Sequence, residues 1–200
     1  MRLIVFHGSP RPKGNTEILL NEALRGAREG GAREGGAKER GGVRITRFDL
    51  NKMNIKGCQA CGYCTEKGAC NIKDDMEKIY PAIYGGERFI VTSPIFFQGV
   101  SAQLKLMIDR AQSIWCEKYL LKKPIEPGPN GRKGLFITVG GMARKDGEKC
   151  SSLAVKAFFR TINVLEHKDL GYLEADEKGA ILKRPEALRE CYEAGRELLS

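Results

Sequence analysis

Residues 3–16 read LIVFHGSPRPKGNT, and this stretch decides the fold. Its first four residues are apolar, with the β-branched and aromatic side chains found in strands that are buried on both faces. The polar sequence GSPRPKGNT follows, and a helix begins after it. A loop between a strand and a helix N-terminus offers free amide groups and the positive end of the helix dipole. This stretch therefore predicts a binding site for an anion.

The loop has a second interpretation, a turn followed by an Asn or Thr helix cap. Its composition favours the anion. It carries the hydroxyls of Ser9 and Thr16 and the cations Arg11 and Lys13, which can surround a terminal phosphate on many sides. It matches neither the G-x-G-x-x-G nor the Walker pattern, so a phosphate monoester is a better candidate than a passing pyrophosphate.

Strand-like and helix-like segments alternate along the rest of the chain. Further strands are predicted at residues 43–48, 88–92, 134–139 and 169–173, with helical patterns between them. This alternation is typical of a doubly wound parallel sheet with helices on both faces. A chain of 200 residues is long enough for one such domain and short for two, so we expect a single domain over residues 1–200.

The composition narrows the class of protein. The chain is 42% hydrophobic and 30% charged, and it contains no apolar run long enough for a transmembrane helix. Its first apolar stretch is too short for a secretion signal, so we expect a cytoplasmic protein with no membrane partner. The net charge of +9 raises the question of nucleic acid, but no helix-turn-helix, zinc-finger or RNA-binding pattern accompanies it. A basic surface also suits an acidic electron carrier or an anionic cofactor.

One segment breaks the alternation. Residues 26–42 read GAREGGAREGGAKERGG, a five-residue repeat. Its alanines recur every five residues and cannot form one apolar helical stripe, and glycine disfavours a helix interior. We expect a solvated, mobile extension of the first helix, tolerated as a surface insertion or serving as a basic docking arm.

Three loops carry a family resemblance. GSPRPKGNT resembles the phosphate loop of the NADPH-dependent FMN reductase and flavodoxin-like family. SPIFFQGVSAQLKLMIDR, from residue 93, resembles that family's second flavin loop and the helix after it, and TVGG at 138–141 resembles its third. The resemblance implies a flavodoxin-like fold, with five strands in the order 2-1-3-4-5, and an FMN cofactor. All three loops follow predicted strands, where open α/β sheets bind ligands.

The resemblance also implies roles for particular residues. Gly14 permits the turn of the first loop, and core packing remains an alternative role for the two phenylalanines of the second. The implied contacts are the FMN phosphate with Ser9, Arg11, Asn15 and Thr16, the ribityl chain and ring edge with Pro94, Ile95, Phe96 and Phe97, and the polar edge of the ring with Thr138, Gly140 and Gly141. Gln98 and Gly99 would complete the second loop.

Four of the seven cysteines form a compact group. They follow the spacing C-x2-C-x2-C-x5-C within residues 57–73, and they are Cys58, Cys61, Cys64 and Cys70. In a chain without an export signal such a group indicates metal or redox chemistry. Three closely spaced thiolates and a fourth can surround a polynuclear cluster, whereas zinc sites more often pair two separated C-x2-C knuckles. The remaining cysteines have no ligand spacing; Cys116 and Cys150 are interpreted as incidental, and Cys191 as a buried apolar residue.

The group resembles the iron–sulfur flavoproteins, a branch of the same family, and this resemblance implies a [4Fe–4S] cluster. Redox-active thiols, a disulfide or zinc remain alternatives. Because the group follows the second strand, at an edge of the sheet, we expect it at the rim of the flavin cleft or near the FMN of a neighbouring subunit. The family suggests a homo-oligomer, a dimer or tetramer, with Asp109 and Arg110 near the interface; a solvated charge pair is their alternative role.

These features suggest an FMN-dependent oxidoreductase in which electrons pass between an external donor such as ferredoxin, a [4Fe–4S] cluster and FMN. One alternative is an NAD(P)H-dependent FMN or quinone reductase without a cluster, with NAD(P)H as substrate. Another is a non-catalytic redox carrier or sensor. No catalytic acid–base pair is visible, and both His7 and His167 are interpreted as structural. Met107 and Trp115 are expected in the core, although Trp115 could border the flavin.

Overall fold

Five parallel strands form the centre of the computed structural model, which describes residues 1–30 and 42–200. Their order across the sheet is β2-β1-β3-β4-β5. The strands are β1 (Arg2–His7), β2 (Arg44–Asp49), β3 (Arg88–Pro94), β4 (Lys133–Val139) and β5 (Glu166–Tyr172). The helices are α1 (Asn15–Gly30), α2 (Tyr63–Lys67), α3 (Met76–Gly85), α4 (Ala102–Arg110), α5 (Gln112–Tyr119), α6 (Asp146–Thr161) and α7 (Pro185–Glu197), with 3-10 turns η1 (Leu50–Lys52) and η2 (Ala180–Lys183). The predicted doubly wound, flavodoxin-like fold class is confirmed.

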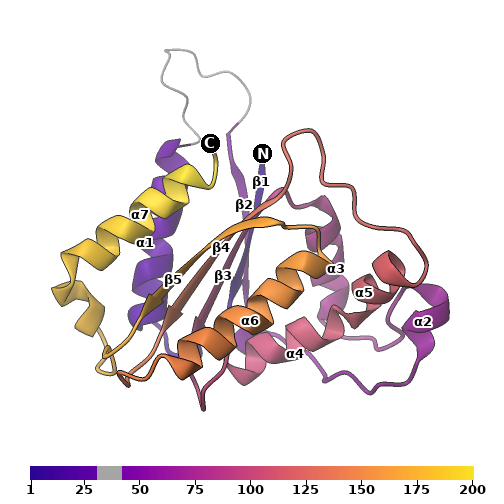
Figure 1. Cartoon of the computed structure of the whole chain (residues 1–200), viewed down its shortest axis with the longest axis horizontal. Coiled ribbons are helices and arrows are strands. Elements are labelled where there is room, and N and C mark those ends of the chain that lie inside the picture. Colours follow the sequence, from indigo (N-terminus) through magenta and orange to yellow (C-terminus); the bar gives the residue numbers. More distant parts are fainter. Residues whose placement is uncertain (31–41) are drawn as a thin grey trace.

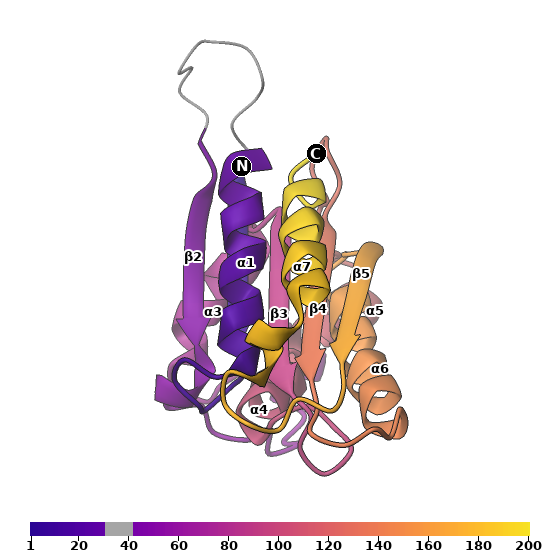
Figure 2. The same ribbon diagram turned by 90° about the vertical axis from the view of Figure 1, so that its left-hand side faces the viewer.

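The helices cover both faces of the sheet. Helices α1 and α7 lie on one face, and α3, α4 and α6 lie on the other (Figure 1). Figure 2 shows α1 and α7 in front of the sheet, with β2 and β5 at its two edges. The central strands β1, β3 and β4 agree with their predicted positions because each contains a continuous buried apolar stretch. β5 begins three residues earlier than predicted, because this edge strand starts with exposed polar residues.

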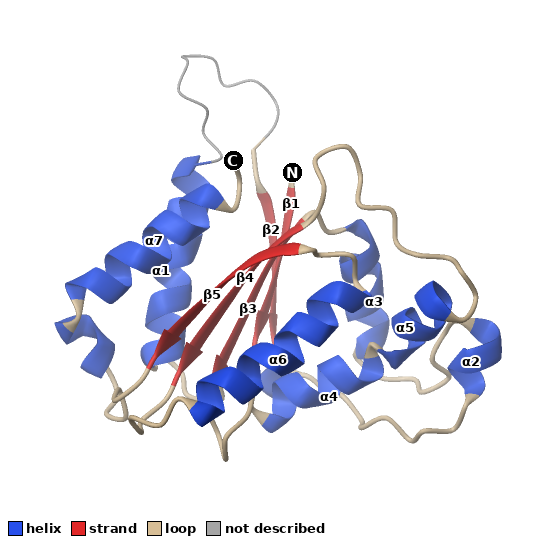
Figure 3. Ribbon diagram, in the orientation of Figure 1, coloured by secondary structure: helices blue, strands red, loops and turns tan. Residues whose placement is uncertain are grey.

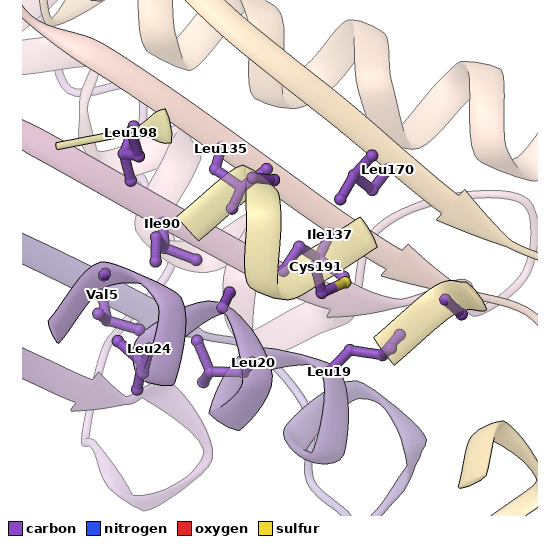
Figure 4. Close-up of a cluster of buried hydrophobic side chains, with 14 of the residues drawn as sticks. Val5, Leu19, Leu20, Leu24, Ile90, Leu135, Ile137, Leu170, Cys191 and Leu198 are labelled. Carbon is purple, nitrogen blue, oxygen red and sulfur yellow. The ribbon is translucent and has the colours of Figure 1, made fainter. Parts of the chain in front are cut away.

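The face under α1 and α7 is filled by one apolar core. Leu19, Leu20 and Leu24 of α1 meet Val5, Ile90, Leu135 and Ile137 of the sheet, with Leu170, Cys191 and Leu198 beside them (Figure 4). Cys191 is fully buried in this cluster, as the sequence predicted. The core fixes α1 against the sheet and thereby fixes the loop that leads into α1.

Helices α1 and α7 pack closely because a glycine on each helix lies against the backbone of the other. A Cβ atom on Gly26 would lie 1.9 Å from the carbonyl oxygen of Tyr192, and one on Gly195 would lie 1.9 Å from that of Ala23. Gly26 and Ala27 are therefore buried helical residues, and the expectation that the repeat is solvated from residue 26 is wrong for its beginning. The expectation of a mobile insertion falls mainly on residues 31–41, which lie outside the described residues.

The opposite face has its own core around α3, α4 and α6. Met107 is buried there as predicted, but Trp115 is 39% exposed and packs on Tyr119, with ring centroids 5.2 Å apart. The prediction that Trp115 is a core residue is wrong, because α5 turns this side of its short helix away from the sheet. Among the described helices, none combines the length and the apolar composition that crossing a membrane requires.

Candidate functional site

The carboxyl ends of the five parallel strands meet at one edge of the sheet, so the loops that follow them gather there (Figure 3). A cavity of about 280 Å³ opens among four of these loops. Its lining residues are Ser9, Arg11, Gly14, Asn15, Thr16, Pro94, Ile95, Phe96, Val139, Gly141, Met142, Ala175 and Asp176. The four residues expected at a phosphate and Gly14 of the same loop line this cavity, together with three of the four expected along the ribityl chain and ring edge.

The loop after β1 has the local geometry of an anion site. Gly14 donates its N–H to the carbonyl of Arg11 over 3.2 Å, which closes a turn directly before α1. Asn15 and Thr16 are the first two residues of α1, and within the described part of the chain no carbonyl or side chain accepts their N–H groups. Free N–H groups at the first turn of a helix attract negative charge, and the Ser9 and Thr16 hydroxyls lie beside them.

The side chain of Asn15 has a different task from the one expected. Its amide nitrogen donates to the carbonyls of Ala175 and Glu177 over 2.9 and 2.8 Å. Its oxygen accepts the N–H groups of Gly179 and Ile181 over 2.9 and 3.3 Å. These four bonds use the hydrogens and lone pairs of the amide. The side chain thus holds the loop after β5 against the first loop, and only the backbone N–H of Asn15 remains for an anion.

A second cavity of about 340 Å³ continues from the first and shares Ile95, Gly141 and Met142 with it. Its other lining residues are Phe97, Gln98, Gly140, Arg144 and Leu173. The loop after β3 borders it with a tight turn, in which Phe96 and Gly99 exchange two backbone hydrogen bonds of 2.9 and 3.1 Å.

The two central residues of this turn are strained. Phe97 and Gln98 have φ angles of 44° and 63°, which non-glycine residues rarely adopt. The Phe97 side chain is also fully exposed, with a relative exposure of 107%. This exposure excludes the core-packing role for Phe97, and the turn presents its ring at the border of the second cavity.

Two residues expected near the flavin do not line either cavity. Thr138 is buried, donates its hydroxyl to the carbonyl of Ser93 over 2.9 Å, and lies beside a separate cavity under α6. Gly99 closes the turn after β3. Sequence reasoning in turn missed Met142, Ala175 and Asp176. The last two follow β5, and the same strand-end rule applied to that strand would have found them.

The four clustered cysteines line a third cavity, of about 480 Å³, in the loop between η1 and α3. Cys58 and Cys61 are exposed, and Cys64 and Cys70 are partly buried. Ala60 and Gly62 both have positive φ angles, so the loop bends sharply between the first two cysteines and α2. Among the described residues, no three His, Cys, Asp or Glu side chains already lie close enough to share one metal ion.

Cys116 lies beside this group, and the prediction that it is incidental is wrong. Its buried Sγ is 3.6 Å from the Sγ of Cys64 and accepts a hydrogen bond from the Gln112 amide. Burial and the Cys116 thiol raise the pKa of Cys64 to about 11. The contact joins α2 to α5, and no local spacing could have shown it because the two residues are 52 positions apart.

Arg110 contradicts the alternative role expected for it, that of a solvated charge, whereas its place near an interface stays a prediction. It pairs with Asp74 over 2.6 Å, and both side chains have no exposed surface, so a solvated Asp109–Arg110 pair is ruled out. Asp109 instead pairs with Lys105 on the surface of α4, over 2.7 Å. Burial alone would lower the pKa of Arg110, but the hydrogen bond to Asp74 and nearby groups including Cys70 raise it.

The third cavity, lined by the four cysteines, is called the cysteine cavity, and the first two are called the strand-end cavities. The cysteine cavity shares no lining residue with either strand-end cavity. The cysteine loop packs beside α5, on the sheet face opposite α1 (Figure 1). The cysteine cavity is therefore separate from the strand-end cavities within one chain, and its position relative to a bound flavin stays a prediction. Neither histidine lines these cavities: His7 is buried with its Nδ1 2.7 Å from the Thr92 hydroxyl, and His167 packs beside Phe159.

The fold and the strand-end loop define a flavodoxin-like protein with a candidate anion site. The sequence profile of the NADPH-dependent FMN reductase family matches residues 1–166, and the chain belongs to that family, in its iron–sulfur flavoprotein branch. An iron–sulfur flavoprotein of Methanocaldococcus jannaschii is 35% identical over 114 residues, 57% of this chain and 53% of that protein.

Two further likenesses have broader coverage. A second iron–sulfur flavoprotein of the same organism is 31% identical over 160 residues, 80% of this chain and 71% of that protein. The chain thus spans from about half to about 70% of the length of these relatives. The structure of an NAD(P)H:quinone oxidoreductase from Methanothermobacter marburgensis superposes with a TM-score of 0.69 at 16% identity, covering 100% of this chain and 96% of that one. This last likeness concerns the fold alone.

Proposed function

We propose that this protein is an FMN-dependent oxidoreductase that binds FMN in the two strand-end cavities and a [4Fe–4S] cluster on Cys58, Cys61, Cys64 and Cys70. The observation that carries the FMN assignment is the free N–H pair of Asn15 and Thr16, which faces a cavity ringed by hydroxyls and Arg11. A phosphate monoester needs this combination of donors. The names of the relatives support the cluster.

The first strand-end cavity would bind the phosphate of FMN, and the second would bind its ring. The phosphate would accept hydrogen bonds from the Asn15 and Thr16 backbone and from the Ser9 and Thr16 hydroxyls, with Arg11 supplying charge. The Asn15 side chain holds the loop after β5, which forms the other side of the first cavity, in place. The second cavity, which continues from the first past Ile95, would receive the ring beside Phe97. Gly140 and Gly141 allow the backbone to approach the ring closely.

The cysteine cavity fits a cluster by the chemistry of its donors. Four thiols border one hollow, and iron–sulfur clusters are bound by four cysteine thiolates. The buried cation Arg110 borders the same hollow and would offset the negative charge of the thiolates. When bound, FMN exchanges one or two electrons and the cluster exchanges one, which supplies the redox chemistry of the protein.

The separation of the cavities supports the proposal of a homo-oligomer. Because the cysteine cavity does not adjoin the strand-end cavities of its own chain, we infer that it serves the FMN of a partner subunit. The exposed ring of Phe97 and the exposed Met142 give the flavin side an apolar border that a partner would cover. The small electron carrier ferredoxin is the proposed external donor, and NAD(P)H is the proposed alternative.

The test is anaerobic reconstitution with FMN, iron and sulfide, followed by an absorption spectrum and iron and sulfide analysis. We expect one FMN and close to four irons per chain. The variant Thr16→Ala should lose FMN affinity at least tenfold, whereas Asn21→Ala, an exposed change on the same helix, should not.

Mixing the loaded protein with reduced ferredoxin or with NADPH then identifies the donor. Reduction by ferredoxin alone supports the carrier-linked function. FMN without iron, together with rapid bleaching by NADPH, would instead show a cluster-free NAD(P)H-dependent reductase. FMN binding that survives Thr16→Ala unchanged would contradict the assignment of the phosphate loop.

A further inference from the structure

The cysteine loop begins and ends at the same pair of buried charges. Arg110, at the end of α4, donates through Nη1 to the carbonyl of Lys56 over 2.9 Å. It donates through Nη2 to the carbonyl of Ile72 over 3.2 Å. Lys56 comes two residues before the first of the four cysteines, and Ile72 comes two residues after the last. One guanidinium therefore spans the base of the loop.

Asp74 completes this base. Its Oδ2 accepts a 2.6 Å hydrogen bond from Arg110 Nη1 and a 2.9 Å hydrogen bond from the N–H of Lys56. Its Oδ1 accepts the N–H of Met76 over 3.0 Å, which anchors the start of α3. The backbone of Lys56 is thus held at both its N–H and its carbonyl. Joining the ends of a loop in this way removes much of the conformational freedom between them.

The guanidinium has one donor left. Within the described residues, Nε of Arg110 is buried and has no hydrogen-bond partner. Arg110 borders the cavity that the four cysteines line. Cys70 lies close enough to help raise the pKa of the guanidinium. A buried N–H without a partner is costly, and a thiolate or a sulfide at this wall would satisfy it.

We propose that Arg110 is a positioning residue of the cysteine site, which closes the base of the loop with Asp74 and supplies a positive charge to the wall that faces the cysteines. This inference rests on the proposed cluster for its electrostatic part, whereas the closure of the loop stands without it. Lysine at position 110 would keep the charge but could not reach both carbonyls, because its ammonium lacks the planar fork of the guanidinium.

The test compares Arg110→Gln, Arg110→Lys and the double variant Asp74→Asn/Arg110→Gln, which leaves no unpaired buried carboxylate. Lys105→Gln, an exposed change on the same helix, is the matched control. Hydrogen–deuterium exchange of the cluster-free full chain is measured for peptides from residues 53–75 and for the strands. Iron and sulfide content and the cluster reduction potential are then measured after anaerobic reconstitution.

We expect all three position-110 variants to speed exchange in the cysteine loop at least tenfold, with the strands unchanged, and to at least halve the iron bound. Loss of the charge should also make the potential more negative in Arg110→Gln than in Arg110→Lys. Loop exchange equal to that of Lys105→Gln, in variants whose strands stay protected, would overturn the inference. If the wild-type chain takes up no iron, the proposed cluster and the electrostatic part fail together, and the exchange rates alone decide the closure of the loop.

Discussion

The Sγ atoms of Cys64 and Cys116 lie 3.6 Å apart, although 52 positions separate the two residues in the chain. This distance makes Cys64 the one member of the four-cysteine group that touches a fifth thiol in the described structure. We expect diamide to oxidise the cluster-free protein to a Cys64–Cys116 disulfide, the two thiols giving two electrons and two protons to the diamide. Peptide mapping under non-reducing conditions detects the product.

The variant Cys116→Ser should abolish this linkage, whereas Cys150→Ser, at an exposed cysteine on α6, should not. A cluster assembled on Cys64 should protect the pair from diamide. Diamide treatment of the cluster-free wild type that yields other disulfides but no Cys64–Cys116 peptide would contradict the prediction.

Asn15→Ala should destabilise the protein and weaken FMN binding together. The substitution removes four hydrogen bonds between α1 and the loop after β5 and leaves backbone groups there unsatisfied. A loss of about 3 kcal/mol in the free energy of unfolding is expected. Urea unfolding measures this loss, with Asn21→Ala as the control. A loss under about 0.5 kcal/mol, the size expected for a surface change, would show that the Asn15 side chain does not hold the loop after β5 in place.

Gly195→Ala should destabilise the protein although alanine favours helices. The added Cβ would lie 1.9 Å from the carbonyl oxygen of Ala23, so α1 and α7 would have to separate. The expected cost is about 3 kcal/mol, which exceeds the ~1 kcal/mol gain in helix propensity. Thermal unfolding checks this, with Gly42→Ala as a control because nothing lies within 4 Å of a Cβ there. A raised melting temperature for Gly195→Ala would show that the contact is loose.

Phe97→Asn should separate stability from ligand binding. Asparagine tolerates the left-handed conformation that Phe97 adopts, so the FMN-free protein should gain about 1 kcal/mol. Removal of the exposed ring from the second cavity should weaken FMN binding severalfold, measured by flavin fluorescence. Phe97→Tyr keeps the ring and should change neither quantity. Unaltered FMN affinity in Phe97→Asn would place the ring of the flavin elsewhere.

His7 should make folding sensitive to mild acid. Burial, with a contribution from Arg47, lowers its pKa from 6.5 to about 4. The unfolded chain therefore takes up the proton at higher pH than the folded chain does. The stabilisation is complete above pH 6.5 and is lost as the pH falls toward 4, with an upper bound of about 3 kcal/mol. In His7→Asn the urea midpoint should change less between pH 4 and 6.5 than it does in the wild type. The same dependence of the midpoint on pH in both proteins would contradict this.

The sequence predicted the features that depend on local pattern. The phosphate loop, the first four strands and the four-cysteine group all lie within short stretches, where spacing and residue type carry the information. The structure places every residue expected at the phosphate around one cavity. The strand-end rule located that cavity before any contact was known.

The features that the sequence did not reveal depend on contacts between distant elements. Cys116 meets Cys64 across α5 and α2, and Arg110 meets Asp74 across 36 positions. The burial of Gly26 at the start of the repeat depends on its close contact with the backbone of α7, which local sequence does not reveal. Asn15 kept its expected place but not its expected partner, since the loop that it holds comes from the far end of the chain.

The close packing of α1 on α7 also bears on how the chain can be engineered. α1 has 16 residues and spans about 24 Å, from the phosphate loop at one edge of the sheet to Gly30 at the other. At Gly30 an added Cβ would lie 2.8 Å from the carbonyl oxygen of Arg196, so the last turn of α1 is anchored. A reporter domain inserted between Gly30 and Gly42 would follow this anchored turn, at the edge of the sheet opposite the strand-end cavities.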